Sequence, residues 1–102
     1  MAIAQAVVGT GATTLYTSSG SNATTAMFFM NDNASARTIN LHIVPSGGTA
    51  GTANQIVKAV SIDPGDTYVI NTEKLVLSNG DFVAASASAG SSVYATISYV
   101  SI

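Results

Sequence analysis

Charged side chains are scarce in this chain of 102 residues. Three are basic and five are acidic, which is 8% of the sequence, where an average soluble domain carries about 25%. Three scattered basic residues and a net charge of −2 cannot supply the row of phosphate contacts that nucleic-acid binding requires. We therefore expect no nucleic-acid partner, and a surface covered by small neutral residues or by another protein.

Cysteine and tryptophan are absent altogether. Without cysteine there is no disulfide framework, no thiolate nucleophile and no cysteine-based metal site, so packing alone must stabilise the fold. No apolar run approaches the roughly 18 residues of a membrane-spanning helix, and the first residues lack the basic region and the apolar length of a signal peptide. We expect no membrane partner, and synthesis in a cytoplasm unless a leader has been removed.

The residues that are abundant favour strands. Thirty residues are Val, Ile or Thr, against four Leu, and β-branched side chains fit a pleated sheet better than a helix. Clusters of Gly, Pro, Asn, Asp and Ser recur at short intervals, as in small sandwiches and barrels. The sequence therefore predicts one all-β domain over 1–102, a jelly-roll-like antiparallel β-sandwich with about eight short strands.

The expected strands lie between these turns, at 3–8, 13–17, 24–31, 37–44, 55–62, 67–72, 81–88 and 92–101. The alternation in 37–44 places Ile39, Leu41 and Ile43 toward the core and His42 toward solvent. Residues 1–12 are either an edge strand or an arm that reaches a neighbouring molecule.

Three connections carry recognisable turn chemistry. The Asp-Pro-Gly-Asp sequence at 63–66 predicts a tight hairpin between 60–62 and 67–70. The Asn-Gly pair at 79–80 suits a type I′ turn that joins 75–77 to 82–83, with a looser loop as the alternative. The longer connection 45–54, rich in Gly, Ser, Thr and Ala, suits a surface crossover between sheets.

The sequence offers little for catalysis or for metal binding. His42 is the single histidine, and on the polar face of a strand it is expected to be a surface residue. Asp63 and Asp66 bracket a turn and have the chemistry of calcium ligands, but they are also ordinary turn residues. The glycine-rich segment 47–51 lacks the lysine of a phosphate-binding loop. We expect no catalytic residues, no cofactor, no metal site and no enzymatic activity.

The segment Met27-Phe28-Phe29-Met30 is the most informative part of the chain. In a strand its residues alternate, so both faces of the strand are large and apolar. One pair fills the core, and the other must be covered by a loop of the same chain or by another subunit. The last strand repeats this ambiguity, which favours a subunit interface. The candidate interface residues are Ile3, Val7, Phe28, Met30, Tyr94, Val100 and Ile102.

The chain resembles a group of small β-sandwich proteins in the virions of tailed bacteriophages. The resemblance is carried by segments 14–17 (TLYT), 43–48 (IVPSGG), 51–56 (GTANQI), 62–67 (IDPGDT) and 80–88 (GDFVAASAS). In similar proteins a Pro-Ala-Gly-Lys-like turn commonly follows the first of these, and here residues 18–22 (SSGSN) replace it. These motifs are strand ends and turns, so they specify a fold more closely than a role.

The resemblance implies a non-enzymatic capsid decoration or cement protein. Such a protein is made in the host cytoplasm and binds the capsid surface as a homo-oligomer, with a trimer favoured, across neighbouring major capsid proteins. The alternative is a tail- or fibre-associated module that binds a receptor or glycan, for which loops at one end of the sandwich, such as 31–36 and 46–54, offer Asn, Ser and Asp side chains. The absence of Trp argues against the glycan-binding alternative.

The shortage of charge is concentrated at the two ends of the chain. No charged side chain occurs in 1–31 or in 82–102. Because desolvating a charge is costly and interface centres are depleted of charge, we expect these segments to lie where subunits or shell meet. The turns that contain Asp32, Asp63, Asp66 and Asp81 are expected to stay in water.

Overall fold

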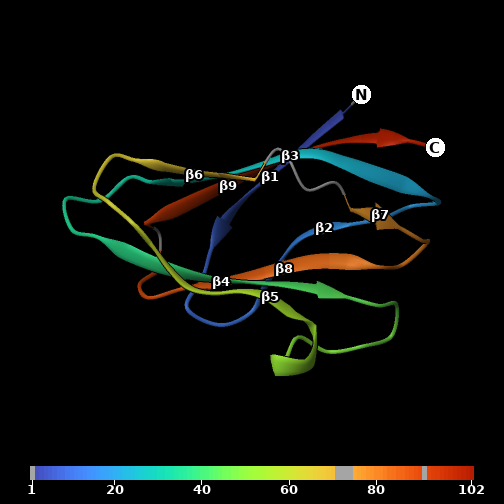
Figure 1. Cartoon of the computed structure of the whole chain (residues 1–102), viewed down its shortest axis with the longest axis horizontal. Helices are drawn as coiled ribbons and strands as arrows, with labels where there is room; N and C mark the ends of the chain where they lie inside the picture. The colour runs from blue at the N-terminus through green and yellow to red at the C-terminus, as the bar shows by residue number, and fades with distance from the viewer. Residues whose placement is uncertain (1, 71–74, 91) are drawn as a thin grey trace.

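The computed structural model describes residues 2–70, 75–90 and 92–102. Within these ranges the chain forms nine strands and one turn of 3-10 helix (Figure 1). The elements are β1 (Ala2–Val8), β2 (Thr13–Thr17), β3 (Asn22–Asn31), β4 (Arg37–Val44), η1 (Thr52–Asn54), β5 (Gln55–Ile62), β6 (Thr67–Ile70), β7 (Val76–Leu77), β8 (Phe82–Ala87) and β9 (Val93–Ser101). The expected all-β class is confirmed, and no helix in the described ranges is long or apolar enough to cross a membrane.

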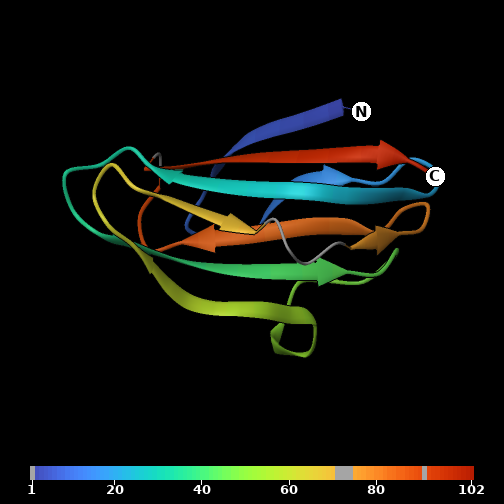
Figure 2. The same ribbon diagram turned by 45° about the horizontal axis from the view of Figure 1, so that its top comes forward.

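The strands form two antiparallel sheets that pack face to face (Figures 1 and 2). Sheet A has the order β1-β9-β3-β6, with the short β7 also paired to β3, and sheet B has the order β2-β8-β4-β5. The chain changes sheet between β1 and β2, β2 and β3, β3 and β4, β5 and β6, β7 and β8, and β8 and β9. Apart from the short β7, this wrapping of eight strands into two four-stranded layers is a jelly roll, as the sequence predicted.

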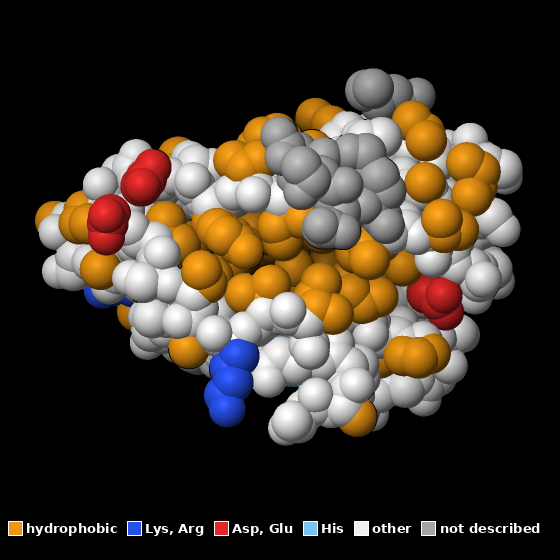
Figure 3. Space-filling model, in the orientation of Figure 1, with side chains coloured by type: hydrophobic (Ala, Val, Ile, Leu, Met, Phe, Trp, Pro, Cys, Tyr) orange, Lys and Arg blue, Asp and Glu red, His pale blue; other side chains and the backbone are white. Residues whose placement is uncertain are grey.

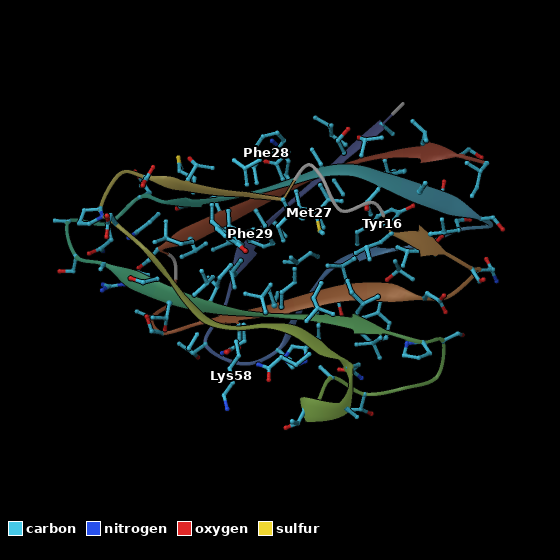
Figure 4. All side chains as sticks on the ribbon, viewed as in Figure 1. Tyr16, Met27, Phe28, Phe29 and Lys58 are labelled. Atoms are coloured by element: carbon cyan, nitrogen blue, oxygen red, sulfur yellow. The ribbon has the colours of Figure 1, made fainter. Side chains whose placement is uncertain are left out.

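The core lies between the sheets and is built from alternating residues of both. Met27 and Phe29 on β3 are fully buried and face Ile39 and Leu41 of the opposite layer, whereas Phe28 points outward (Figure 4). The other fully or nearly fully buried apolar side chains of this core are Val8, Ile62, Leu77, Val83, Ala85, Val93, Ala95 and Ile97. Ile43, which the alternation placed in the core, is only half-buried. In the Met27–Met30 run, Met27 and Phe29 therefore fill the core, and Phe28 and Met30 face outward.

The turn at 63–66 forms, but the hairpin predicted around it is wrong. The Asp66 N–H donates to the Asp63 carbonyl at 3.0 Å, and Gly65 adopts the left-handed φ of 74° that such a turn needs. However, β5 pairs with β4 in sheet B, while β6 pairs with β3 in sheet A. The turn therefore carries the chain from one layer of the sandwich to the other.

The other two predicted connections are also wrong. At 78–81 the Asp81 N–H donates to the Ser78 carbonyl at 3.0 Å and Gly80 has a φ of 89°, but Asn79 lacks the positive φ of a type I′ turn. It is not a hairpin, because β7 pairs with β3 and β8 pairs with β2 and β4. The connection 45–54 is not a crossover, because β4 and β5 are neighbours in sheet B.

Candidate functional site

Exposed apolar side chains gather on the outward surface of sheet A, which we call the outer face. Val7 on β1, Tyr94 on β9, Met30 and Phe28 on β3, and Val69 on β6 are each between 39% and 44% exposed. They come from the four main strands of the sheet. Their alternation with buried neighbours is what turns them outward.

Strand register places these side chains beside one another. Val7 is opposite Tyr94, and Tyr94 is opposite Met30, so three strands contribute to one row across the sheet. Two residues along β3, Phe28 is opposite Val69 on β6. Directly opposed side chains in antiparallel strands lie about 4.5–5.5 Å apart, so the five form one continuous patch.

The outer face carries no charge in any of its strands. β1, β3, β6, β7 and β9 contain no acidic or basic residue, and the polar groups between the apolar ones are neutral, among them Gln5 and Thr96. A shallow hollow of about 310 Å³ lies over the paired strands β1 and β9 and is lined by Gln5, Ala6, Val7, Tyr94, Ala95 and Thr96. An apolar, uncharged centre is the composition of a protein interface rather than of a free surface.

The candidate interface residues are mostly on this surface. Ile3, Val7, Phe28, Met30, Tyr94 and Ile102 are exposed, Ile3 and Ile102 by more than 60%, whereas Val100 is half-buried. Val69 was not among the candidates. The alternation in Thr67–Ile70, with Tyr68 and Ile70 packed against the core, is the signal that turns Val69 outward.

A second apolar region belongs to the rim of the core. Figure 3 shows apolar side chains in the band between β6 and β5, with acidic side chains toward both ends of this view. Val57 and Val60 of β5, and Tyr68 and Ile70 of β6, are half-buried and pack against the core cluster. Lys58 projects into solvent beside them (Figure 4). Contact with the core therefore explains why the side chains of this second region are apolar, whereas the exposed side chains of the outer face are not explained in this way.

His42 is buried, and the expectation of a surface histidine is wrong. Its Nδ1 lies 3.0 Å from the carbonyl oxygen of Gly51 and 3.2 Å from Oδ1 of Asn54. Both partners are acceptors, so Nδ1 carries the proton and donates it. The connection 45–54 folds back over β4 and covers the ring, which makes His42 an anchor for that loop.

The acidic turns are held by backbone contacts rather than arranged as a metal site. Asp32, Asp63 and Asp66 are exposed, as expected, whereas Asp81 is half-buried and accepts the backbone N–H groups of residues 46 and 78, each at 2.9 Å. The described residues contain no group of three or more His, Cys, Asp or Glu close enough to share a metal ion. The Asp63 and Asp66 pair thus lacks further acidic or histidine ligands among these residues.

Asn31 joins the connections at one end of the sandwich, a role the sequence did not reveal. Its side chain is fully buried at the end of the row that contains Met27 and Phe29. Its amide donates to the carbonyls of Ser35 and Ile62, each at 2.9 Å, and its Oδ1 accepts the N–H of Asn33 at 3.0 Å. Asn31 therefore holds the β3–β4 loop against the end of β5.

The two loops considered for sugar recognition lie at opposite ends of the sandwich. β4 separates residues 31–36 from residues 46–54 (Figures 1 and 2), and its eight residues span about 26 Å. They cannot combine into one binding site, so the expectation that they share one end is wrong.

Tyr16 of β2 and Tyr99 of β9 link the two sheets. Their rings stack with centroids 4.2 Å apart and planes 28° from parallel. Burial raises the pKa of Tyr16 above its ordinary value of 10.0, a hydrogen bond with Ser18 opposes this, and Tyr99 adds to it. The pair has a structural explanation, as an aromatic contact between the layers.

Comparisons of the chain with protein-family models, with curated proteins and with solved structures found no match. The candidate functional site is therefore defined by the geometry of the outer face.

Proposed function

We propose that this chain is a non-enzymatic structural protein of a tailed-phage virion, a capsid decoration or cement protein. It is made in the host cytoplasm and binds the capsid surface as a homo-oligomer across neighbouring major capsid proteins. The observation that carries the proposal is the outer face of sheet A, a continuous apolar patch in strands without charge. The resemblance of its turns and strand ends to phage virion proteins supplies the biological setting.

A cement protein acts by burying surface, so its mechanism is area and shape rather than bond chemistry. Four strands spaced about 4.8 Å apart, each about seven residues long, give the outer face a footprint of roughly 450 Å². A stable interface buries about 800 Å² of each partner. One copy is therefore expected to bind weakly, and a homo-oligomer gains strength by engaging several shell subunits at once.

Co-sedimentation with empty shells assembled from the major capsid protein of the same phage tests the proposal. The wild-type chain should pellet with the shells, and Phe28→Lys and Tyr94→Lys should not, because each places a charge at the centre of the outer face. Ile56→Lys is the matched control: Ile56 is 51% exposed but lies on β5 of sheet B, so this variant should still pellet.

Two results would overturn the proposal. Equal pelleting of wild type, Phe28→Lys and Ile56→Lys would remove the outer face from shell binding. Detection of the protein on isolated tails but not on purified heads would replace the cement role with the tail-associated one. Light scattering tests the oligomer separately, since a monomer at micromolar concentration contradicts a preformed oligomer.

A further inference from the structure

In the described ranges the two sheets have five edge strands, and four of them are protected from pairing with another chain. β6 is only four residues long, and β7, which pairs with β3 alone, has two residues. β2 has five residues and a register shift between Thr14 and Tyr16. β5 carries Lys58 and a bulge in which Ala59 takes a φ of 52°. Short length, an irregularity or a lysine are the usual means by which proteins block edge-to-edge association.

β1 has none of these protections. It runs for seven residues in unbroken register with β9, and it contains no charge, no proline and no bulge. Figure 2 shows it along the border of sheet A, beyond β9. Its backbone N–H and C=O groups that point away from β9 therefore form a regular row without strand partners among the described residues.

The sequence of β1 is self-complementary about Gln5. If two copies of the strand run antiparallel with Gln5 opposite Gln5, then Ile3 lies opposite Val7 and Ala4 lies opposite Ala6. On the outward side this pairs a β-branched residue with a β-branched residue, and an amide with an amide. On the inward side it pairs alanines, whose side chains are small enough to meet between two sandwiches.

The exposure of these side chains fits the same arrangement. Ile3 is 62% exposed and Val7 44%, while Ala4 and Ala6 are half-buried at the border of the core. No charged residue lies on β1, or on β2 and β9 beside it, that would repel a second copy or resist desolvation.

We propose that β1 pairs antiparallel with β1 of a second copy of this chain, centred on Gln5, so that sheet A continues across a two-fold axis. The contact forms about six to eight backbone hydrogen bonds, depending on which alternate residues face the free edge. It places two outer faces side by side in one sheet of eight principal strands. The pairing thereby doubles the shell-binding surface. Only this doubling rests on the proposed function, and the strand pairing itself does not.

The predicted stoichiometry differs from the trimer that the resemblance favours. A two-fold contact between identical edges closes on itself, so it produces a dimer or an assembly with an even number of copies. The mass of the wild-type protein in solution is therefore the first readout. An even multiple of 10.2 kDa supports the contact, and a trimer or monomer contradicts it.

Disulfide trapping tests the register, and the natural absence of cysteine leaves no background. In Gln5→Cys the two sulfurs face each other across the axis, within the roughly 4.4–6.8 Å between Cα atoms that a disulfide needs, so the variant should become a covalent dimer under mild oxidation. Ile3→Cys is the matched control, because its two copies lie about 13 Å apart and should not cross-link. A mixture of Ile3→Cys and Val7→Cys chains should cross-link only as the mixed pair.

Charge exchange tests the contact without a covalent bond. Gln5→Lys and Gln5→Glu should each be monomeric, because like charges meet at the axis, and a one-to-one mixture should recover the dimer. Circular dichroism on each variant verifies that the sandwich remains folded, since Gln5 is exposed and, within the described residues, its side chain makes one hydrogen bond, to Thr96 Oγ1 at 3.4 Å.

The outcomes separate this contact from the shell-binding role. Phe28→Lys should abolish shell binding while the Gln5→Cys cross-link still forms. Cross-linking of Gln5→Cys no faster than that of Ile3→Cys, or a dimer that persists in Gln5→Lys, would overturn the edge pairing even if shells are still bound.

Discussion

Neighbouring phenylalanines on β3 provide a quantitative test of the fold. Phe29 is fully buried, so Phe29→Ala should lose both its transfer free energy and the cost of the cavity, about 3–5 kcal/mol. Phe28 is 39% exposed on the outer face, so it keeps contact with water and leaves no closed cavity. Full burial of such a side chain contributes about 1.5–3 kcal/mol, and the covered part of Phe28 should therefore contribute about 1–2 kcal/mol.

A domain of this length has roughly 5–15 kcal/mol of stability, so these two costs have different consequences. In urea unfolding followed by circular dichroism at low micromolar concentration, Phe29→Ala should shift the midpoint strongly or fail to fold, while Phe28→Ala should remain a cooperative folded protein. Equal losses for the two variants at low concentration would refute the assignment of Phe28 to the outside of the sandwich. A Phe28→Ala loss that grows with protein concentration would instead report burial in an oligomer.

Three further predictions concern single positions. Gly80→Ala should cost about 2–3 kcal/mol in urea unfolding, because the added Cβ would clash with Ser46 Oγ and lie 2.9 Å from the Cβ of Ser46. Gly65→Ala, at a similar φ but in open space, should cost about 1 kcal/mol. Equal costs for the two variants would contradict the predicted clash. Asn31→Asp should cost about 3 kcal/mol, since it replaces a buried donor to two carbonyls with an acceptor; a neutral result would remove the proposed anchor. Because the pKa of Tyr16 is raised in the folded state, its hydroxyl is neutral in both the folded and the unfolded chain below about pH 10, and its contribution to stability is complete there. Above about pH 10 the unfolded chain ionises first and this contribution is lost, so the melting temperature of Tyr16→Phe should fall less than that of wild type between about pH 9 and 11. Equal falls in melting temperature would contradict the effect of burial.

The local elements of this fold were predictable because β-branched alternation and turn residues act over a few positions. The bounds of β2, β4 and β5 match the predicted strands, and the turns at 63–66 and 78–81 form where the sequence placed them. The pairing of strands was not predictable from the same signals. Gly65 and Gly80 set backbone dihedral angles, but a tight turn can join neighbours in one sheet or cross to the other layer.

The candidate site was predictable in kind but not in detail. The doubly apolar run at Met27–Met30 required one exposed row, yet its two rows are so alike in size that composition does not choose between them. Packing chooses, because Phe29 lies between Ala95 and Tyr68 in the register of sheet A. His42 was misassigned since alternation describes a bare sheet and does not include a loop that folds back over it.

In the proposed function, the uncharged outer face of sheet A binds a phage shell. Cryo-electron microscopy of the intact particle tests it most directly, because the orientation of a 10.2 kDa sandwich on the shell shows which surface is buried. We expect β1, β9, β3 and β6 to lie against the major capsid protein, with the acidic turns toward solvent. Density for this protein on the tail alone, or on the head with the outer face in solvent, would contradict it.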